Sequence, residues 1–311
     1  MGTPVMDFVI NLPHMPPKDG AVMANEIFYQ GGGKVASALV ASARLGAESG
    51  MIAHIGGDTA GDFILRDFSY NGVDTSRIVR DRKDKSSAFC ISMSEMEFGT
   101  RCFIGKLKKE FSMLQIEDLD YNYISSAKIL HIESGDPVST AAAKFAHENG
   151  ILVSIDADHY TEEFDQLLPY IDIFIGSEYY LKIRYGDLSY KESSEAVHKA
   201  GPSVVWFTLG KNGCIGLINN RFYEIPAYNV TVHDTTGAGD VFHGAYLAAM
   251  LEGLAHEECA RYACAVSSIK CTFVGGRTGI PTREVLSRYM DDGIILQDEF
   301  EKRLEYYRSN F

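Results

Sequence analysis

The chain has 311 residues, of which 46% are hydrophobic and 23% charged, a composition typical of a globular protein with a sizeable core. Its formal net charge of -13 argues against nucleic acid or an anionic membrane as the main partner. No apolar run approaches the length of a membrane span, no secretory signal is visible, and the six cysteines contain no C-x-x-C pair, so we expect a reducing, cytoplasmic setting.

Short apolar runs alternate with amphipathic stretches along most of the chain. This alternation of strand and helix predicts a mainly parallel sheet that helices cover on both faces. The predicted strands are Met51–Ile55, Ile129–Ile132, Leu152–Ile155, Ile171–Ile175, Val204–Thr208, Cys214–Ile218 and Phe222–Val232. The predicted helices are Val35–Leu45, Thr59–Asn71, Thr140–Asn149, Tyr190–Lys199, Val241–Leu251, His256–Cys271 and Glu284–Met290.

Two extended stretches, Asp7–Gln30 and Ala88–Ile104, break this alternation. The second contains two β-like runs separated by Glu95–Gly99, a pattern typical of a hairpin. The stretches are either edge strands of the main sheet or a small β lid formed by about residues 7–30 and 86–106. A lid would keep water away from a reaction beneath it.

The most informative segment is the run Asp234–Tyr246, which lies where a predicted strand gives way to a predicted helix. The small residues Gly237, Ala238 and Gly239 let backbone N–H groups approach an anion, and the helix N-terminus adds partial positive charge. Asp240 would repel a resting phosphate, so its useful role is to take a proton from an attacking hydroxyl. The run therefore indicates phosphoryl transfer to an alcohol; the alternative is a tight turn with Asp240 as a helix-terminal charge.

With this run, the chain resembles the ribokinase-like (PfkB) carbohydrate kinases over roughly Gly2–Arg283. The resemblance implies an α/β fold, a ribokinase-like three-layer sandwich with a mainly parallel central sheet plus a small β-sheet lid, in one domain of residues 1–311. It also implies a catalytic base and an anion hole for the transferred phosphate: Asp240, and Gly237, Ala238 and Gly239.

A second match is the glycine-rich turn that begins at Gly31, which in this family contacts the sugar together with the helix after it. The resemblance implies four acceptor-binding residues here: Gly32, Gly33, Lys34 and Ser37. Ser37 stands where the family usually has Asn, so the hydroxyl pattern that it recognises can differ. A solvated loop lysine is the alternative for Lys34.

Two carboxylates and one arginine complete the expected acceptor site. Asp7 comes directly after Gly2–Met6, and in this family the aspartate that binds the substrate follows the matching strand. The alternative is that Asp7 caps the loop. Glu133 resembles a family glutamate that reaches the sugar, and it ends a predicted strand, where ligands bind in open α/β sheets. Arg101 begins a basic cluster with Lys106, Lys108 and Lys109, which is either a solvated face or a site for an anionic group of the acceptor.

Two further segments resemble the nucleotide-binding parts of the family. Thr208–Gly213 matches Thr-Leu-Gly-x-x-Gly along the ATP phosphates and ribose, although alone it is typical of a hairpin turn, and Gly275–Gly279 matches the loop near adenine. The residues expected at ATP are Thr208, Gly210, Gly213, Thr236, Gly275 and Gly276. Asp234 and Thr236 lie where the family often holds a monovalent cation, so the resemblance also raises potassium as an activator.

One departure concerns magnesium. The family commonly has Asn-x-x-Glu after the strand that matches Ile171–Ile175, and this Glu helps to hold the magnesium shell through water. Ser177 and Tyr180 take these two places here, which leaves Glu178 as the candidate carboxylate. ATP and Mg²⁺ are still expected as cofactors, because phosphoryl transfer needs charge neutralised on the β and γ phosphates.

The leading hypothesis is an ATP-dependent kinase. It would transfer the γ-phosphate to a primary hydroxyl of a sugar or sugar derivative. One alternative keeps the chemistry and changes the acceptor to a nucleoside, a sugar phosphate or a sugar acid. Another is a non-catalytic sugar- or nucleotide-binding pseudokinase, which the altered Ser177–Tyr180 segment motivates. A lid sheet with an exposed edge predicts a homodimer through the lid.

Overall fold

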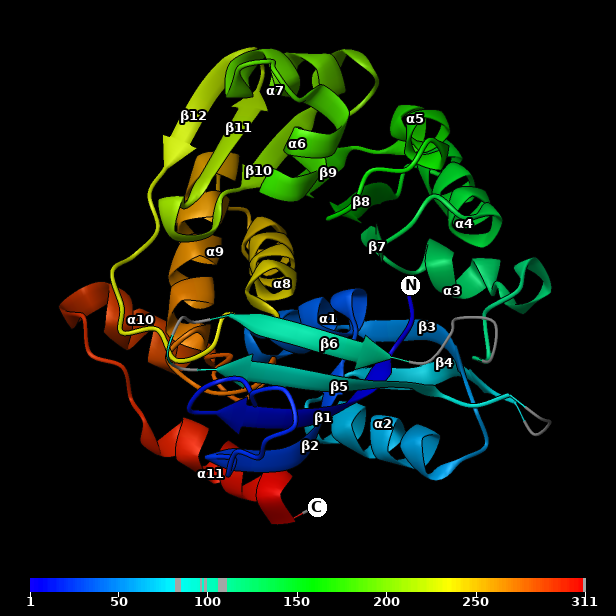
Figure 1. Cartoon of the computed structure of the whole chain (residues 1–311). Helices are drawn as coiled ribbons and strands as arrows, with labels where there is room; N and C mark the ends of the chain where they lie inside the picture. Colours follow the sequence, from blue (N-terminus) through cyan, green and yellow to red (C-terminus); the bar gives the residue numbers. More distant parts are fainter. Residues whose placement is uncertain (82–84, 96, 98–99, 106–110, 310–311) are drawn as a thin grey trace.

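A six-stranded sheet forms the upper part of the molecule in the computed structural model, which describes residues 1–81, 85–95, 97, 100–105 and 111–309 (Figure 1). Its strand order is β12-β11-β10-β9-β8-β7, with β7 to β10 parallel and the last two strands antiparallel. The strands are β7 (Ile129–Ile132), β8 (Leu152–Ala157), β9 (Ile173–Ser177), β10 (Val204–Thr208), β11 (Cys214–Ile218) and β12 (Arg221–Ile225).

Helices cover both faces of this sheet. Alternate side chains of β9 show the two layers, because Ile173 and Ile175 pack with α1, α8 and α9, whereas Phe174 packs with α4 to α7. The helices are α1 (Lys34–Arg44), α2 (Thr59–Tyr70), α3 (Tyr121–Ser125), α4 (Pro137–Glu148), α5 (Glu163–Leu167), α6 (Glu178–Tyr185), α7 (Tyr190–Lys199), α8 (Ala238–Leu251), α9 (His256–Lys270), α10 (Arg283–Asp292) and α11 (Asp298–Ser309). Short 3-10 helices are η2 (Ile116–Asp118), η3 (Leu168–Tyr170) and η4 (Gly210–Asn212).

Helix α8 runs through the interior, and its residues from Val241 to Ala249 are all buried. It packs closely on α1, where a Cβ atom on Gly244 would lie 2.0 Å from the carbonyl oxygen of Ala38. Glycine is therefore required at this crossing. The close packing fixes the first turn of α8 relative to the glycine-rich turn that precedes α1.

A two-stranded parallel sheet of β3 (Gly50–Ile55) and β4 (Asp74–Arg80) is separate from the six-stranded sheet. The first residues of the chain join the two. The Met1 amino group donates to the carbonyl oxygen of His131 in β7 at 2.6 Å, and the Gly2 N–H donates to that of Ile52 in β3 at 3.4 Å. The predicted α/β sandwich is confirmed, with its parallel strands divided between these two sheets.

The stretches that interrupt the alternation form a sheet of their own, of order β2-β1-β5-β6, which lies below α8 in Figure 1. It contains β1 (Val5–Leu12), β2 (Glu26–Gly32), β5 (Ala88–Glu95) and β6 (Arg101–Gly105). They are thus not edge strands of the main sheet. Most of the predicted turn between the last two strands lies outside the described residues, as do the predicted lid end and basic residues Lys106, Lys108 and Lys109.

Some predicted boundaries were wrong. Strand β12 ends at Ile225 and not at Val232, because Pro226 has no N–H for the ladder. Helix α4 begins at Pro137, three residues before the predicted start, because Asp136 accepts from the N–H groups of Val138 and Ser139 and caps it.

Among the described residues, no helix combines the length and the apolar character needed to cross a membrane.

Candidate active site

The run around Asp240 forms the first turn of α8, as the sequence predicted. Gly237 caps the helix with a left-handed φ of 73°, and a Cβ there would lie 3.2 Å from the backbone of Gly276. Among the described residues, no hydrogen-bond partner is found for the N–H groups of Gly239 and Asp240. A Cβ on Gly239 would meet no atom within 4 Å. Free N–H groups facing open space at a helix N-terminus can receive an anion.

The Asp240 carboxyl is partly open to solvent but has an unfavourable electrostatic environment. Desolvation by the surrounding protein raises its pKa to about 8, and repulsion from Asp156, Asp158 and Glu133 acts in the same direction. The positive charge of Lys34 opposes these effects. A carboxyl with a pKa near neutrality is suited to general-base work.

Lys34, at the start of α1, lies among these carboxylates. Its Nζ donates to Asp158 Oδ1 at 2.8 Å and to the Glu133 carbonyl oxygen at 3.4 Å. Burial lowers the pKa of Lys34, but the charges of Asp156, Asp158 and Glu133 outweigh it and hold the pKa above its ordinary value. Lys34 is therefore a fixed cation of the site and not a solvated loop lysine.

Glu133 connects three segments. Its Oε1 accepts from the N–H of Thr3 at 2.8 Å, and its Oε2 accepts from the N–H of Val35 at 3.1 Å. A Cβ on Gly2 would lie only 2.7 Å from this carboxylate, so glycine leaves the room that it occupies. Burial raises its pKa, while Lys34 and the two N–H groups lower it. Glu133 thus holds the chain start against the glycine-rich turn.

Asp7 of β1 faces the same turn. A Cβ on Gly32 would lie 2.1 Å from its Oδ2, so the carboxylate sits directly against this glycine. Burial raises the pKa of Asp7 to about 7, although the charge of Arg277 lowers it. Gly33 is the N-cap of α1 with a φ of 92°, and a Cβ there would lie 2.4 Å from the carbonyl oxygen of Thr3. Both glycines are required by close contacts.

Arg277 is a buried residue that sequence analysis missed. Its guanidinium donates to the Gly32 carbonyl oxygen at 3.0 Å, to Ser37 Oγ at 3.4 Å and to Asp67, and its N–H donates to Gln30. Ser37, which the resemblance places at the acceptor, is only 2% exposed, and its hydroxyl faces Arg277. The arginine therefore links the 275–279 loop to the glycine-rich turn.

The two expected nucleotide segments occupy different places. Thr208 ends β10, beside the end of β9, and Gly210 and Gly213 have left-handed φ values of 57° and 84°. A Cβ on Gly213 would lie 2.0 Å from the carbonyl oxygen of Ile225. No described contact joins this turn to the start of α8, so its role toward ATP stays a prediction.

Asp234 joins the segment before α8 to the second nucleotide loop. It accepts from the N–H groups of Thr236 at 2.8 Å and of Gly275 at 2.9 Å. Burial raises its pKa, but the charge of Lys270 and these bonds give a net decrease, so it is ionised. Thr236 Oγ1 is buried without a hydrogen-bond partner among the described residues.

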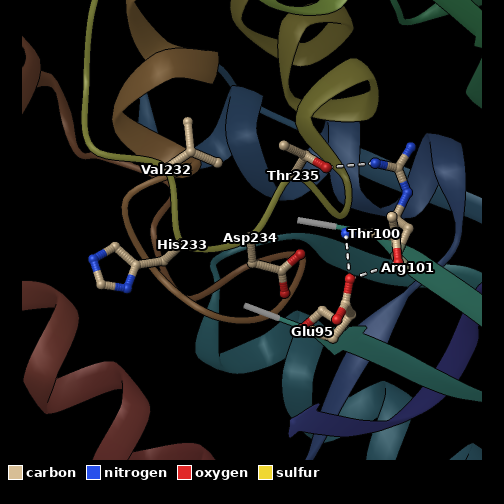
Figure 2. A pocket seen from close by; sticks show the side chains of 8 residues that line it. Glu95, Thr100, Arg101, Val232, His233, Asp234 and Thr235 are labelled. Carbon is tan, nitrogen blue, oxygen red and sulfur yellow. Dashed lines mark hydrogen bonds between the residues drawn. The ribbon is translucent and has the colours of Figure 1, made fainter. Parts of the chain in front are cut away.

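Arg101 brings the sheet of β1, β2, β5 and β6, the predicted lid, to this segment. Figure 2 shows its guanidinium donating to Thr235 Oγ1, at 2.5 Å, across a small pocket. The pocket is lined by Ser94, Glu95, Thr100, Arg101, Val232, His233, Asp234 and Thr235. Strand β6 thus touches the chain directly before the helix start.

The altered magnesium segment has structural roles. Ser177 caps α6 by accepting from the N–H of Tyr180 at 3.1 Å, and Tyr180 is fully buried among aromatic rings that include Phe174. Glu178 lies 3.0 Å from Lys182 on an exposed face of α6. No group of three or more His, Cys, Asp or Glu residues that could hold a metal ion occurs in the part of the chain that the structure describes.

Asp156 and Asp158 were missed as site residues, whereas the sequence places His243 one helical turn beyond Asp240, where it either faces the site or packs in the core. Asp156 Oδ1 lies 3.5 Å from His243 Nε2, one helical turn beyond Asp240, and both side chains are almost fully buried. Burial lowers the pKa of His243, so its imidazole is neutral. The two aspartates could have been found by the rule that selected Glu133, since β8 ends at the same edge of the sheet as β7.

Fold and site together define a class: a phosphotransferase with an alcohol acceptor, built as a ribokinase-like α/β sandwich. The sequence model of the pfkB family carbohydrate kinases matches residues 2–283, so the chain belongs to this family. It is similar to the ribokinase of Haemophilus influenzae, with 26% identity over 298 residues that cover 94% of this chain and 97% of the relative.

Two further comparisons agree. The nucleoside kinase of Methanothermobacter thermautotrophicus is 25% identical over 297 residues, which cover 93% of this chain and 94% of the relative. The crystal structure of ribokinase from Thermotoga maritima matches with a TM-score of 0.79 and 25% identity, over 94% of this chain and 98% of the other. The predicted family, fold and enzyme class are confirmed, while the individual site residues stay predictions.

Proposed function

We propose that the protein transfers the γ-phosphate of ATP to a primary hydroxyl of a sugar or sugar derivative. The observation that carries this proposal is the position of the Asp240 carboxyl beside free N–H groups and open space at the start of α8. Membership of the pfkB carbohydrate kinases and similarity to ribokinases support a sugar-like acceptor.

Asp240 takes the proton from the acceptor hydroxyl, whose oxygen then attacks the γ-phosphate. The free N–H groups of Gly239 and Asp240 stabilise the charge that develops on the transferred group. Asp7, Lys34 and Glu133 hold the acceptor from the lid side and from the end of β7. Magnesium, which the family implies, neutralises charge on the β and γ phosphates when bound.

A nucleoside is the second acceptor class, and similarity to a nucleoside kinase favours testing it. Phe28 is fully buried in the core and is not free to stack on a base, whereas Phe103 is 56% exposed. Phe8 packs 5.2 Å from Tyr29 in the lid sheet. An anionic acceptor would use Arg101, whose guanidinium now donates to Thr235.

A monovalent cation site belongs to the same proposal. Thr236 Oγ1 is an unpartnered buried oxygen next to the ionised Asp234, which suits a cation such as potassium. The backbone around it is already held by two N–H bonds to Asp234.

The test is ATP consumption by purified protein with magnesium, with and without potassium, across sugars, sugar phosphates, sugar acids and nucleosides. Asp240→Asn should lower kcat by about 10²–10⁴-fold with ATP affinity retained, because it removes the base and keeps the side-chain shape. Asp187→Asn, an exposed carboxylate in a loop, is the matched control and should be fully active.

Turnover that survives in Asp240→Asn would contradict the assigned base. ATP or sugar binding without turnover of any acceptor would contradict the kinase proposal and favour the non-catalytic binding protein.

A further inference from the structure

Helix α11 lies after residue 283, the last residue that the family model matches, yet part of it is buried in the molecule. Figure 1 shows it beside β2, the edge strand of the lid sheet. The buried side chains of α11 are Phe300, Arg303 and Tyr307. The two aromatic rings pack in the hydrophobic core, whereas a buried arginine needs hydrogen-bond partners. The partners of Arg303 therefore show what this helix holds.

The Arg303 guanidinium reaches the end of the 275–279 loop. Its Nη1 donates to the carbonyl oxygen of Thr278 at 2.8 Å and to that of Ile280, and its Nη2 pairs with Glu299, one turn earlier on α11. Thr278 is fully buried, and among the described residues no other donor to its carbonyl oxygen is found. A buried carbonyl group that loses its donor is costly, so Arg303 fixes this end of the loop.

The 275–279 loop has no regular secondary structure, so side chains from other elements determine its shape. Gln30 of β2 accepts from the N–H of Arg277 at 2.9 Å. From α1, Arg44 donates to the Arg277 carbonyl oxygen at 2.6 Å. Arg303 adds a support from a third element, which lies in the part of the chain that the family model does not match.

The beginning of the same loop supports the start of α8. The Gly275 N–H donates to Asp234, in the segment before the helix, at 2.9 Å. A Cβ on Gly237, the N-cap of α8, would lie 3.2 Å from the backbone of Gly276. A displacement of the loop would therefore change the position of the helix start and of the free N–H groups there.

We propose that Arg303 of α11 is a positioning residue for nucleotide binding: it holds the 275–279 loop in the conformation that fixes the first turn of α8. Arg303 is only 5% exposed, so it acts through the loop and not by contact with a ligand. Its effect on the nucleotide rests on the proposed kinase function, whereas its effect on the loop is measured without any ligand.

Amide hydrogen exchange of the unliganded protein tests the structural step. In Arg303→Met, exchange in residues 271–280 and at the start of α8 should become about tenfold faster, because the loop loses a support. Arg303→Lys should recover part of the protection, since an ammonium group still donates to carbonyl oxygens. The matched control is Arg308→Met, which breaks the contact of α11 with Glu26 on β2 and keeps the loop contacts. It should leave exchange in both segments unchanged.

Calorimetry with a non-hydrolysable ATP analogue and Mg²⁺ tests the functional step without turnover. In Arg303→Met the dissociation constant of the analogue should rise by about tenfold, whereas in Arg308→Met it should stay the same. A second control is Val197→Ala, which removes packing from the core on the opposite face of the six-stranded sheet. It should lower the melting temperature and keep the affinity, which separates positioning from a general loss of stability.

The inference is overturned if exchange in Arg303→Met equals that of the unaltered protein, or if it rises while affinity for the analogue stays the same. It is also overturned if either control weakens binding as much as Arg303→Met does. Should Arg303→Met fail to fold, Glu299→Gln takes its place. Because it removes the charge that orients the guanidinium, it should speed exchange in the same residues, and unchanged exchange would contradict the inference.

The proposed function fails separately from this assignment. A protein in which Arg303→Met speeds exchange of the loop, but which binds no ATP analogue, would contradict the kinase proposal and keep the structural link between α11 and the start of α8.

Discussion

At the scale of single residues, the proposed acceptor site contains a carboxyl group, Asp7, whose ionised form destabilises the folded protein. The pKa of Asp7 is raised from 3.8 to about 7, mainly by burial. The folded protein therefore binds this proton more tightly than the unfolded chain does. The contribution of Asp7 to the free energy of unfolding should therefore be highest below pH 4. It should fall as the pH rises through 7.

Asp7→Asn removes this titration and should raise the melting temperature at pH 8 but change it little at pH 4, where Asp7 is already neutral. For a chain of 311 residues, a gain of 1 kcal/mol corresponds to about 1.5 °C. Scanning calorimetry at both pH values measures the difference, with Asp187→Asn as the control. An equal shift at both pH values would contradict the raised pKa. The same variant should bind the acceptor more weakly.

At the scale of elements, two glycines at the start of α8 have different roles, one in the fold and one in the proposed site. Gly237 is required by its left-handed φ of 73° and its contact with Gly276, so Gly237→Ala should destabilise the fold. Gly239 has no such constraint, and its Cβ would point into open space. Its role is then to leave the approach to the helix free for an anion.

We therefore expect Gly239→Ala to fold with a melting temperature equal to or above that of the unaltered protein, because alanine is favoured over glycine in a helix by about 1 kcal/mol. Its kcat/KM for ATP should fall by about tenfold or more, because the methyl group occupies the path of the phosphate. Steady-state kinetics and thermal melting measure the two effects. Full activity in this variant would show that no anion approaches Gly239.

The lid sheet shows how an element far from α8 in sequence reaches the site. Arg101 of β6 contacts Thr235 before α8, and β2 of the same sheet ends at Gly32, directly before the helix that carries Lys34. The sheet is therefore placed to cover a ligand at the helix start and to exclude water from it.

At the scale of the whole molecule, the free edge of the lid sheet predicts a homodimer. All residues of β6 are exposed, and Phe103 and Ile104 expose 56% and 54% of their surface. An uncovered edge strand with apolar side chains is prone to pair with another strand. We expect this partner to be a second copy of the chain.

Phe103→Lys should convert a dimer into a monomer, because it places a charge at the centre of this edge. Ile183→Lys is the control, since Ile183 is 55% exposed on α6, away from the lid. Light scattering coupled to size-exclusion chromatography measures the mass of each. A monomeric unaltered protein, or a dimer that persists in Phe103→Lys, would contradict this arrangement.

Sequence patterns predicted those features that depend on neighbouring residues. Continuous apolar runs such as Val204–Thr208 form strands because both faces are buried. The Gly237–Asp240 run marks a helix start because backbone conformation and capping are local. Boundaries failed where one residue decides the end of an element, as Pro226 does after β12.

What the sequence by itself determined is therefore the family, the alternation of elements and the position of the helix start at Gly237–Asp240. Only the tertiary structure decided that Asp156 faces His243, that Arg277 holds the turn around Gly32, and that Glu133 connects Thr3 to α1. These contacts join segments that are tens to hundreds of residues apart. The charge and burial that set the pKa of Asp240 arise from such contacts, and no local pattern contains them.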